Sequence, residues 1–110
     1  MQVFSTRTYE RAIRKLLGEE ARREMEDSVV AAPDAAPVIR SAGGIRKLRW
    51  AGSGRGKRGG IRTVYFYHAG PEAIYFLTAY AKAGREDLTP ADTRTLSRLV
   101  AAIKKETSGR

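Results

Sequence analysis

The spacing of apolar positions predicts one strand, two helices, three strands and a last helix, in that order. Residues 2–5 alternate between apolar and polar side chains and predict a short first strand. A helical stripe follows, with Thr6 in place to cap it and Gly18 in place to end it. The members of this stripe are Tyr9, Ile13, Leu16 and Leu17.

A second helix is predicted from Glu19 to the residue before Pro33, because two glutamates suit the positive end of a helix and proline stops one. Its inner face is expected to consist of Ala21, Met25, Val29 and Ala32. The charged residues on the outer faces of both helices are expected to be solvated. Residues 32–44 show no period and predict a connector.

Three strands are predicted in the middle of the chain, at residues 45–51, 61–68 and 73–81. In the first of them, Lys47 and Arg49 share one side and Leu48 and Trp50 share the other. The second is bulky or β-branched at nearly every position, which is typical of a central strand covered on both faces.

The last helix has the clearest start. Thr89, Pro90 and Asp92 have the spacing of a capping box with proline at the first helical position. The residues expected to be buried on this helix are Leu96, Leu99, Val100 and Ile103. Together the elements predict a single α+β domain over residues 1–110, with helices packed against a twisted, mostly antiparallel sheet.

Charge is concentrated in one segment. The net charge is +9, and residues 40–70 hold eight basic residues and no acidic one. A basic surface kept only for solubility would not need this clustering, whereas a polyanionic partner such as RNA, DNA or an acidic protein would favour it.

Several classes of protein are excluded by what the sequence lacks. Without cysteine there is no disulfide, zinc–thiolate site or cysteine nucleophile, and the only histidine, His68, excludes a paired-histidine nuclease. No pair of carboxylates lies near the basic segment, so we expect no metal and no cofactor. No apolar run is long enough to span a membrane, and we expect a soluble protein of the cytoplasm.

The glycines between the two basic strands match the glycine pattern of dinucleotide-binding sites, but not the secondary structure that such a site needs. Gly54, Gly56 and Gly59 satisfy G-x-G-x-x-G, but a strand is predicted to follow where a dinucleotide site needs a helix. Lys57 is followed by Arg58 rather than serine or threonine, so the phosphate-loop pattern fails as well. We interpret the segment as a hairpin tip whose glycines let the chain approach a nucleic-acid backbone closely.

Cleavage of RNA is feasible with basic side chains alone. RNA carries its own nucleophile, the 2′-hydroxyl, and a lysine surrounded by cations has a lowered pKa and can act as a base. Arginines can stabilise the additional negative charge of the transition state.

Two motifs carry a resemblance to a known family. The segments "GGIRKLRWAGSGRGKRGGIRTVYFY" and "IYFLTAYAKAGREDLTPADTRTLSRLV" resemble toxins of the RelE/ParE superfamily, closest to the HigB-like branch, and the similarity covers about the whole chain. The resemblance implies a small RelE-like fold with the order β-α-α-β-β-β-α. It also implies a toxin of a type II toxin–antitoxin system that cuts mRNA in the ribosomal A site without a metal.

The resemblance implies a site of basic side chains. Arg62 corresponds to an arginine that contacts the scissile phosphate. Further matches are Lys47 and Arg49 on the preceding strand, Lys57 and Arg58 at the hairpin tip, and Lys82 after the last strand. Lys57 or Lys47 is expected to be the general base, and Arg62 and Lys82 to stabilise the transition state. The expected RNA contacts are Arg46, Arg49, Arg55, Arg58 and Tyr65, with Tyr67 and Tyr80 as further candidates to stack on a base. Ala83 and Gly84 stand where the family commonly has Asn-Glu.

The implied partners are mRNA in the ribosomal A site, the 16S and 23S rRNA surface and a cognate HigA/RelB-like antitoxin, with no membrane. Two alternatives remain at this stage: a ParE-like poison of DNA gyrase that cuts nothing, and a simple basic nucleic-acid-binding module. A converging basic site favours catalysis over both.

Overall fold

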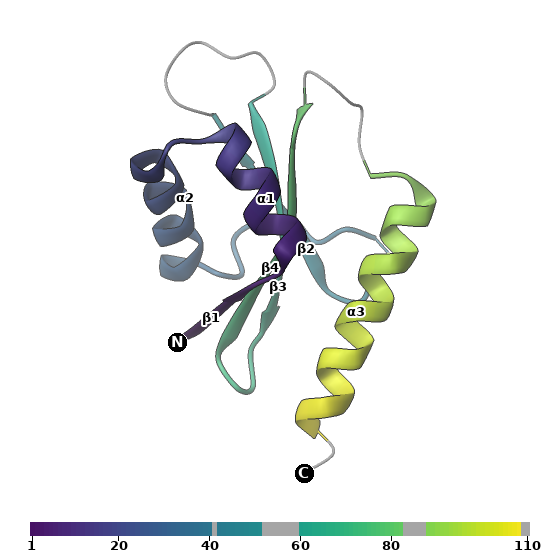
Figure 1. Ribbon diagram of the computed structural model, residues 1–110. Coiled ribbons are helices and arrows are strands. Elements are labelled where there is room, and N and C mark those ends of the chain that lie inside the picture. Colours follow the sequence, from purple (N-terminus) through teal and green to yellow (C-terminus); the bar gives the residue numbers. More distant parts are fainter. Residues whose placement is uncertain (41, 52–59, 83–87, 109–110) are drawn as a thin grey trace.

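The computed structural model describes residues 1–40, 42–51, 60–82 and 88–108. A four-stranded sheet lies between helices on its two faces (Figure 1). The elements are β1 (Gln2–Ser5), α1 (Arg7–Leu16), α2 (Glu19–Ala31), β2 (Ile45–Trp50), β3 (Ile61–His68), β4 (Ala73–Ala81) and α3 (Pro90–Ser108). The strand order is β1-β4-β3-β2, with β1 parallel to β4 and the other pairs antiparallel. The α+β class and the predicted order of elements are confirmed.

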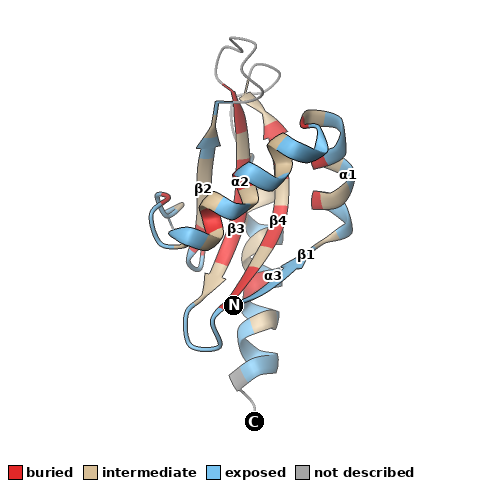
Figure 2. Cartoon of the chain, turned by 90° about the vertical axis from the view of Figure 1, so that its left-hand side faces the viewer, coloured by how far each residue is buried: buried red, intermediate tan, exposed pale blue. Residues whose placement is uncertain are grey.

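Two apolar cores lie on the two faces of the sheet. Helices α1 and α2 cover one face, and α3 crosses the other (Figure 2). The first core contains Tyr9, Ile13, Met25, Val29, Ile61, Tyr65 and Phe76. The second contains Ile45, Val64, Phe66, Leu77, Tyr80 and Val100. Because β3 contributes side chains to both cores, its continuous run of bulky residues is explained as the sequence predicted.

The charged faces of α1 and α2 are not simply solvated, which corrects the sequence-based expectation. The guanidinium of Arg22 on α2 donates hydrogen bonds to Glu10 at 2.8 Å and to Glu26 at 2.9 Å. The hydroxyl of Tyr9 donates to Glu26 at 2.5 Å. These bonds connect the two helices. The bond from Arg22, followed by one that the Ser5 hydroxyl donates at 2.6 Å, holds the pKa of the Glu10 carboxyl below its usual range.

Two apolar positions were placed wrongly by periodicity. Ala32 is exposed, because α2 ends at Ala31. Leu99 is 37% exposed, while Val100 beside it is 1% exposed and carries the packing of α3. The start of α3 follows the prediction: the backbone N–H of Thr89 donates to the Asp92 carboxylate, and the N–H of Asp92 donates to the Thr89 hydroxyl.

Strand β4 contains an irregularity that changes which side chains share a face. The register with β3 shifts between Val64 and Tyr65, so Leu77 is an extra residue on β4. Leu77 packs in the core under α3, and Thr78 beside it is the register partner of Val64 in that same core. Two consecutive residues therefore lie on the α3 side, as a β-bulge allows.

Thr6 bonds to two consecutive carbonyls of β4 at the bulge. Its N–H donates to the carbonyl of Phe76 at 3.0 Å, and its hydroxyl donates to the carbonyl of Leu77 at 2.7 Å. The same hydroxyl accepts from the N–H of Tyr9 and caps α1. The start of α1 is thereby fixed to the bulge.

Candidate nucleic-acid interface

The register of the sheet brings the basic strand residues onto one face. Arg49 on β2 lies directly opposite Arg62 on β3, and Lys47 lies opposite Val64. Val64 packs in the core under α3, and side chains two residues apart on a strand share a face. Lys47, Arg49 and Arg62 therefore lie on the α3 face of the sheet. We call these three residues the basic row.

The basic row brings like charges close together. The Cβ atoms of directly opposed residues on antiparallel strands lie about 4.5–5.5 Å apart, and like charges so placed are destabilising. Arg49 is exposed, while Arg62 and Lys47 are half-buried. The planar guanidinium of arginine suits a phosphate in particular, and the register places two arginines, Arg49 and Arg62, side by side.

Gly60 and Lys82 fix the end of the sheet beside the basic row. The N–H of Lys82 donates to the carbonyl of Gly60 at 3.1 Å. Gly60 has a φ of +60°, and a Cβ built on it would lie 2.2 Å from the carbonyl oxygen of Trp50. Only glycine fits this close approach of β2 to the start of β3. Sequence reasoning treated the glycines here as a means of approaching phosphates and missed this packing requirement.

Two predicted RNA contacts have other roles in the structure. Tyr65 is 1% exposed, and its hydroxyl donates to the carbonyl of Pro33 at 2.8 Å. Burial raises the pKa of this phenol. Arg46 lies opposite Tyr65, on the face of the sheet that α1 and α2 cover, and donates to the carbonyls of Asp34 and Ala36 at 3.1 and 2.7 Å. Both residues hold the connector after α2, so neither belongs to the basic row.

The other candidate aromatic residues do not offer an exposed ring on the basic row. Tyr80 lies opposite Arg62 but is 6% exposed, and Tyr67 packs against the core under α1 and α2. The side chain of His68 contacts the hydroxyl of Thr107 near the end of α3 at 2.8 Å. The expectations for Arg55, Lys57, Arg58, Ala83 and Gly84 fall outside the described residues.

Comparison with known proteins identifies the family. The model of the family described as "RelE toxin of RelE / RelB toxin-antitoxin system" matches residues 1–109. The chain belongs to the RelE toxin family. It is therefore a toxin of a toxin–antitoxin system that inhibits translation, and the gyrase-poison alternative is not favoured.

Solved structures of RelE toxins share the fold. The chain is similar to a chain of the intact E. coli RelBE toxin–antitoxin complex, with 17% identity, a TM-score of 0.54 and coverage of 71% of this chain and 92% of that chain. It is also similar to a free-state E. coli RelE mutant in which two arginines are replaced by alanine. There the identity is 14%, the TM-score 0.54 and the coverage 88% and 93%. The assignment to the HigB-like branch stays a prediction.

The described residues contain no group of three or more histidine, cysteine, aspartate or glutamate side chains placed to hold a metal ion. Over the same residues, no helix is both long and apolar enough to cross a membrane.

Proposed function

We propose that this RelE-family toxin cuts mRNA on the ribosome at the basic row. The observation that carries the proposal is the cross-strand pairing of Arg49 with Arg62, with Lys47 next to them on the same face. Such a row suits a chain of phosphates, and RNA supplies the nucleophile that the protein lacks. The partners in this proposal are mRNA in the A site, rRNA around it and a cognate antitoxin that neutralises the toxin.

The reaction is an attack of RNA on its own backbone. The 2′-hydroxyl loses its proton to Lys47 or Lys57, and the 2′-oxygen forms a bond to phosphorus. The bond from phosphorus to the 5′-oxygen breaks, and that oxygen takes up a proton from solvent. The products are a 2′,3′-cyclic phosphate, or the 3′-phosphate that water forms from it, and a 5′-hydroxyl. Arg62 and Lys82 stabilise the negative charge that develops on the phosphoryl oxygens.

Ribosome dependence follows from the kind of groups available. A row of cations can position the RNA and stabilise the charge of the transition state, but it supplies little directed proton transfer. The ribosome therefore has to present the mRNA in a reactive geometry. We expect cleavage of programmed ribosomes and poor cleavage of the same mRNA without them. Efficient cleavage of naked RNA at equal toxin concentration would contradict this expectation and indicate a self-sufficient nuclease.

Arg62→Ala tests the site. Removing one group that stabilises transition-state charge should lower the single-turnover cleavage rate on ribosomes by about 10²–10³-fold. Arg23→Ala is the matched control, because Arg23 is exposed on α2 and its loss changes the net charge equally. Circular dichroism checks that both variants are folded. If Arg62→Ala is folded and cleaves as fast as Arg23→Ala, the assigned role of Arg62 is wrong.

A further inference from the structure

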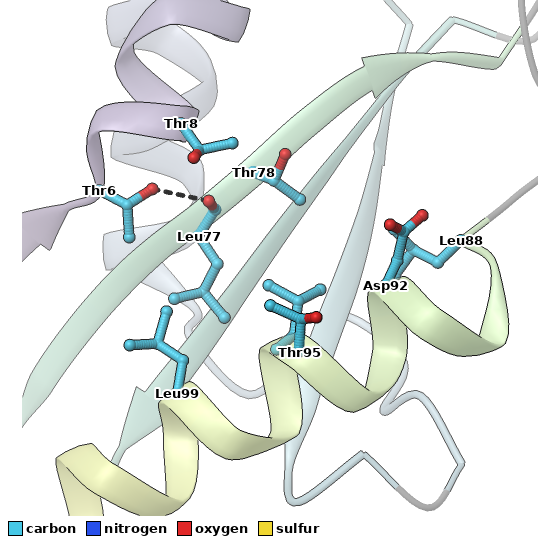
Figure 3. Close-up of a pocket in the computed structure, with 9 residues that line it drawn as sticks. Thr6, Thr8, Leu77, Thr78, Leu88, Asp92, Thr95 and Leu99 are labelled. Atoms are coloured by element: carbon cyan, nitrogen blue, oxygen red, sulfur yellow. Dashed lines mark hydrogen bonds between the residues drawn. The ribbon is translucent and has the colours of Figure 1, made fainter.

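A pocket lies beside the basic row, on the same side of the sheet. It has a volume of about 360 Å³, at the lower end of the range for small-molecule sites. The start of α1, the bulge of β4 and the first half of α3 line it (Figure 3). Its apolar lining comes from Leu77, Leu88, Leu96 and Leu99, and its polar lining from Thr6, Thr8, Thr78, Thr95 and Asp92.

Three of the threonine hydroxyls are available to a bound group, since Thr8 and Thr95 are exposed and Thr78 is half-buried. Within the described part of the chain, the hydroxyls of Thr8, Thr78 and Thr95 make no hydrogen bond. A hydroxyl both donates and accepts, so three of them around leucine side chains suit a flat group with an apolar face and a polar edge. The exposed Leu99 is accounted for by the same pocket, since its side chain lines it.

The pocket lies close enough to the basic row for one ligand to occupy both. Thr78 is the register partner of Val64, and Arg62 is the partner of Tyr80, so Thr78 and Arg62 are diagonal neighbours on one face. Such neighbours lie about 7–8 Å apart. The bulge is what directs Thr78 to this face, and bulges are over-represented next to active sites.

We propose that this pocket holds a nucleobase of the RNA whose phosphates lie on the basic row, and that it contributes to the choice of codon. The proposal rests on the proposed function. A nucleobase is favoured over an apolar protein segment because the neighbouring cations attract a phosphate backbone, and because an apolar segment would leave the three hydroxyls without partners.

The test uses the double variant Thr78→Val/Thr95→Val, which removes two hydroxyls and keeps the branched shape of the side chains. Thr93→Val is the control, since Thr93 also lies on α3 but does not line the pocket. Each toxin is mixed with ribosomes carrying an mRNA library, and 5′ ends are mapped to give the cleavage rate at every codon. A lost hydrogen bond corresponds to a factor of roughly five. We expect the ratio of rates between preferred and disfavoured codons to change at least about fivefold in the double variant and to stay unchanged in Thr93→Val.

The remaining outcomes overturn the proposal in distinguishable ways. If the double variant keeps the codon ratios of the parent, or slows cleavage at all codons equally, the pocket does not select a base. The proposed function still stands in that case if Arg62→Ala has lost cleavage. If the variant weakens antitoxin binding and leaves codon ratios intact, the occupant is the antitoxin. If the parent toxin cleaves no mRNA on ribosomes, both proposals fall.

Discussion

Substitution of Gly60 offers the sharpest test of how the sheet supports the site. Gly60→Ala introduces a Cβ at a φ of +60°, 2.2 Å from the carbonyl oxygen of Trp50 and 3.3 Å from the Cα of Ala51. Two effects therefore add. The left-handed conformation costs a non-glycine residue about 1–2 kcal/mol, and overpacking against backbone that must shift typically costs about 1–3 kcal/mol. We expect the free energy of unfolding to fall by about 2–5 kcal/mol, a large part of the total for a domain of this size.

Two other glycines separate these effects. Gly43 has a φ of +76°, but the nearest atom to its Cβ position is a side-chain carbon of Val100 at 3.8 Å, so Gly43→Ala tests the backbone strain alone. Gly70 has neither a positive φ nor an atom within 4 Å, so Gly70→Ala tests neither effect. The expected losses are about 1–2 kcal/mol for Gly43→Ala and none for Gly70→Ala.

Urea denaturation followed by circular dichroism measures all three variants against the parent. Gly70→Ala should be the most stable of the three variants, Gly43→Ala the next and Gly60→Ala the least stable. If Gly60→Ala is as stable as Gly43→Ala, the contact with Trp50 does not constrain the sheet, and the reasoning from steric overlap fails.

Two further predictions concern the bonds between α1 and α2. Tyr9→Phe removes the hydroxyl that donates to the Glu26 carboxylate, so the free energy of unfolding measured by urea denaturation should fall by about 1.5–3 kcal/mol. A loss below about 0.5 kcal/mol would show that the bond is not stabilising. Glu10 has a lowered pKa in the folded state, so its contribution is present above the unfolded pKa of about 4.3 and is lost as pH falls through the folded value. Thermal unfolding between pH 6 and about pH 2 should therefore decline less steeply for Glu10→Gln than for the parent, and parallel curves would refute the assignment.

Local patterns were sufficient to predict most of the fold. The stripe of α1, the capping box of Thr89 and Asp92 and the two-sided burial of β3 all depend on residues close together in sequence. The same holds for the shared side of Lys47 and Arg49, which follows from strand alternation. These features of the candidate site needed only the period of a single element.

Features that depend on distant residues could not be predicted. The bulge at Leu77 is stabilised by Thr6, and these residues are 71 positions apart. Tyr65 was a reasonable RNA contact because a strand buried on both faces gives no clue to which aromatic ring stays accessible. The exposure of Leu99 has the same origin, since a helical stripe does not reveal that one part of it lines a pocket instead of a core.

The bulge in β4 determines on which face of the sheet each later side chain of the strand lies. Before it, Ile74 and Phe76 pack under α1 and α2; after it, Ala79 packs there and Tyr80 lies opposite Arg62. Strict alternation through Leu77, without the bulge, would invert this second half and turn Tyr80 away from the face of Arg62, although every basic residue would remain in the chain. Net charge and residue content are thus insufficient to define the site. Two chains with the same basic residues can differ by one position of strand register, and only one of them would present a continuous surface to a phosphate backbone.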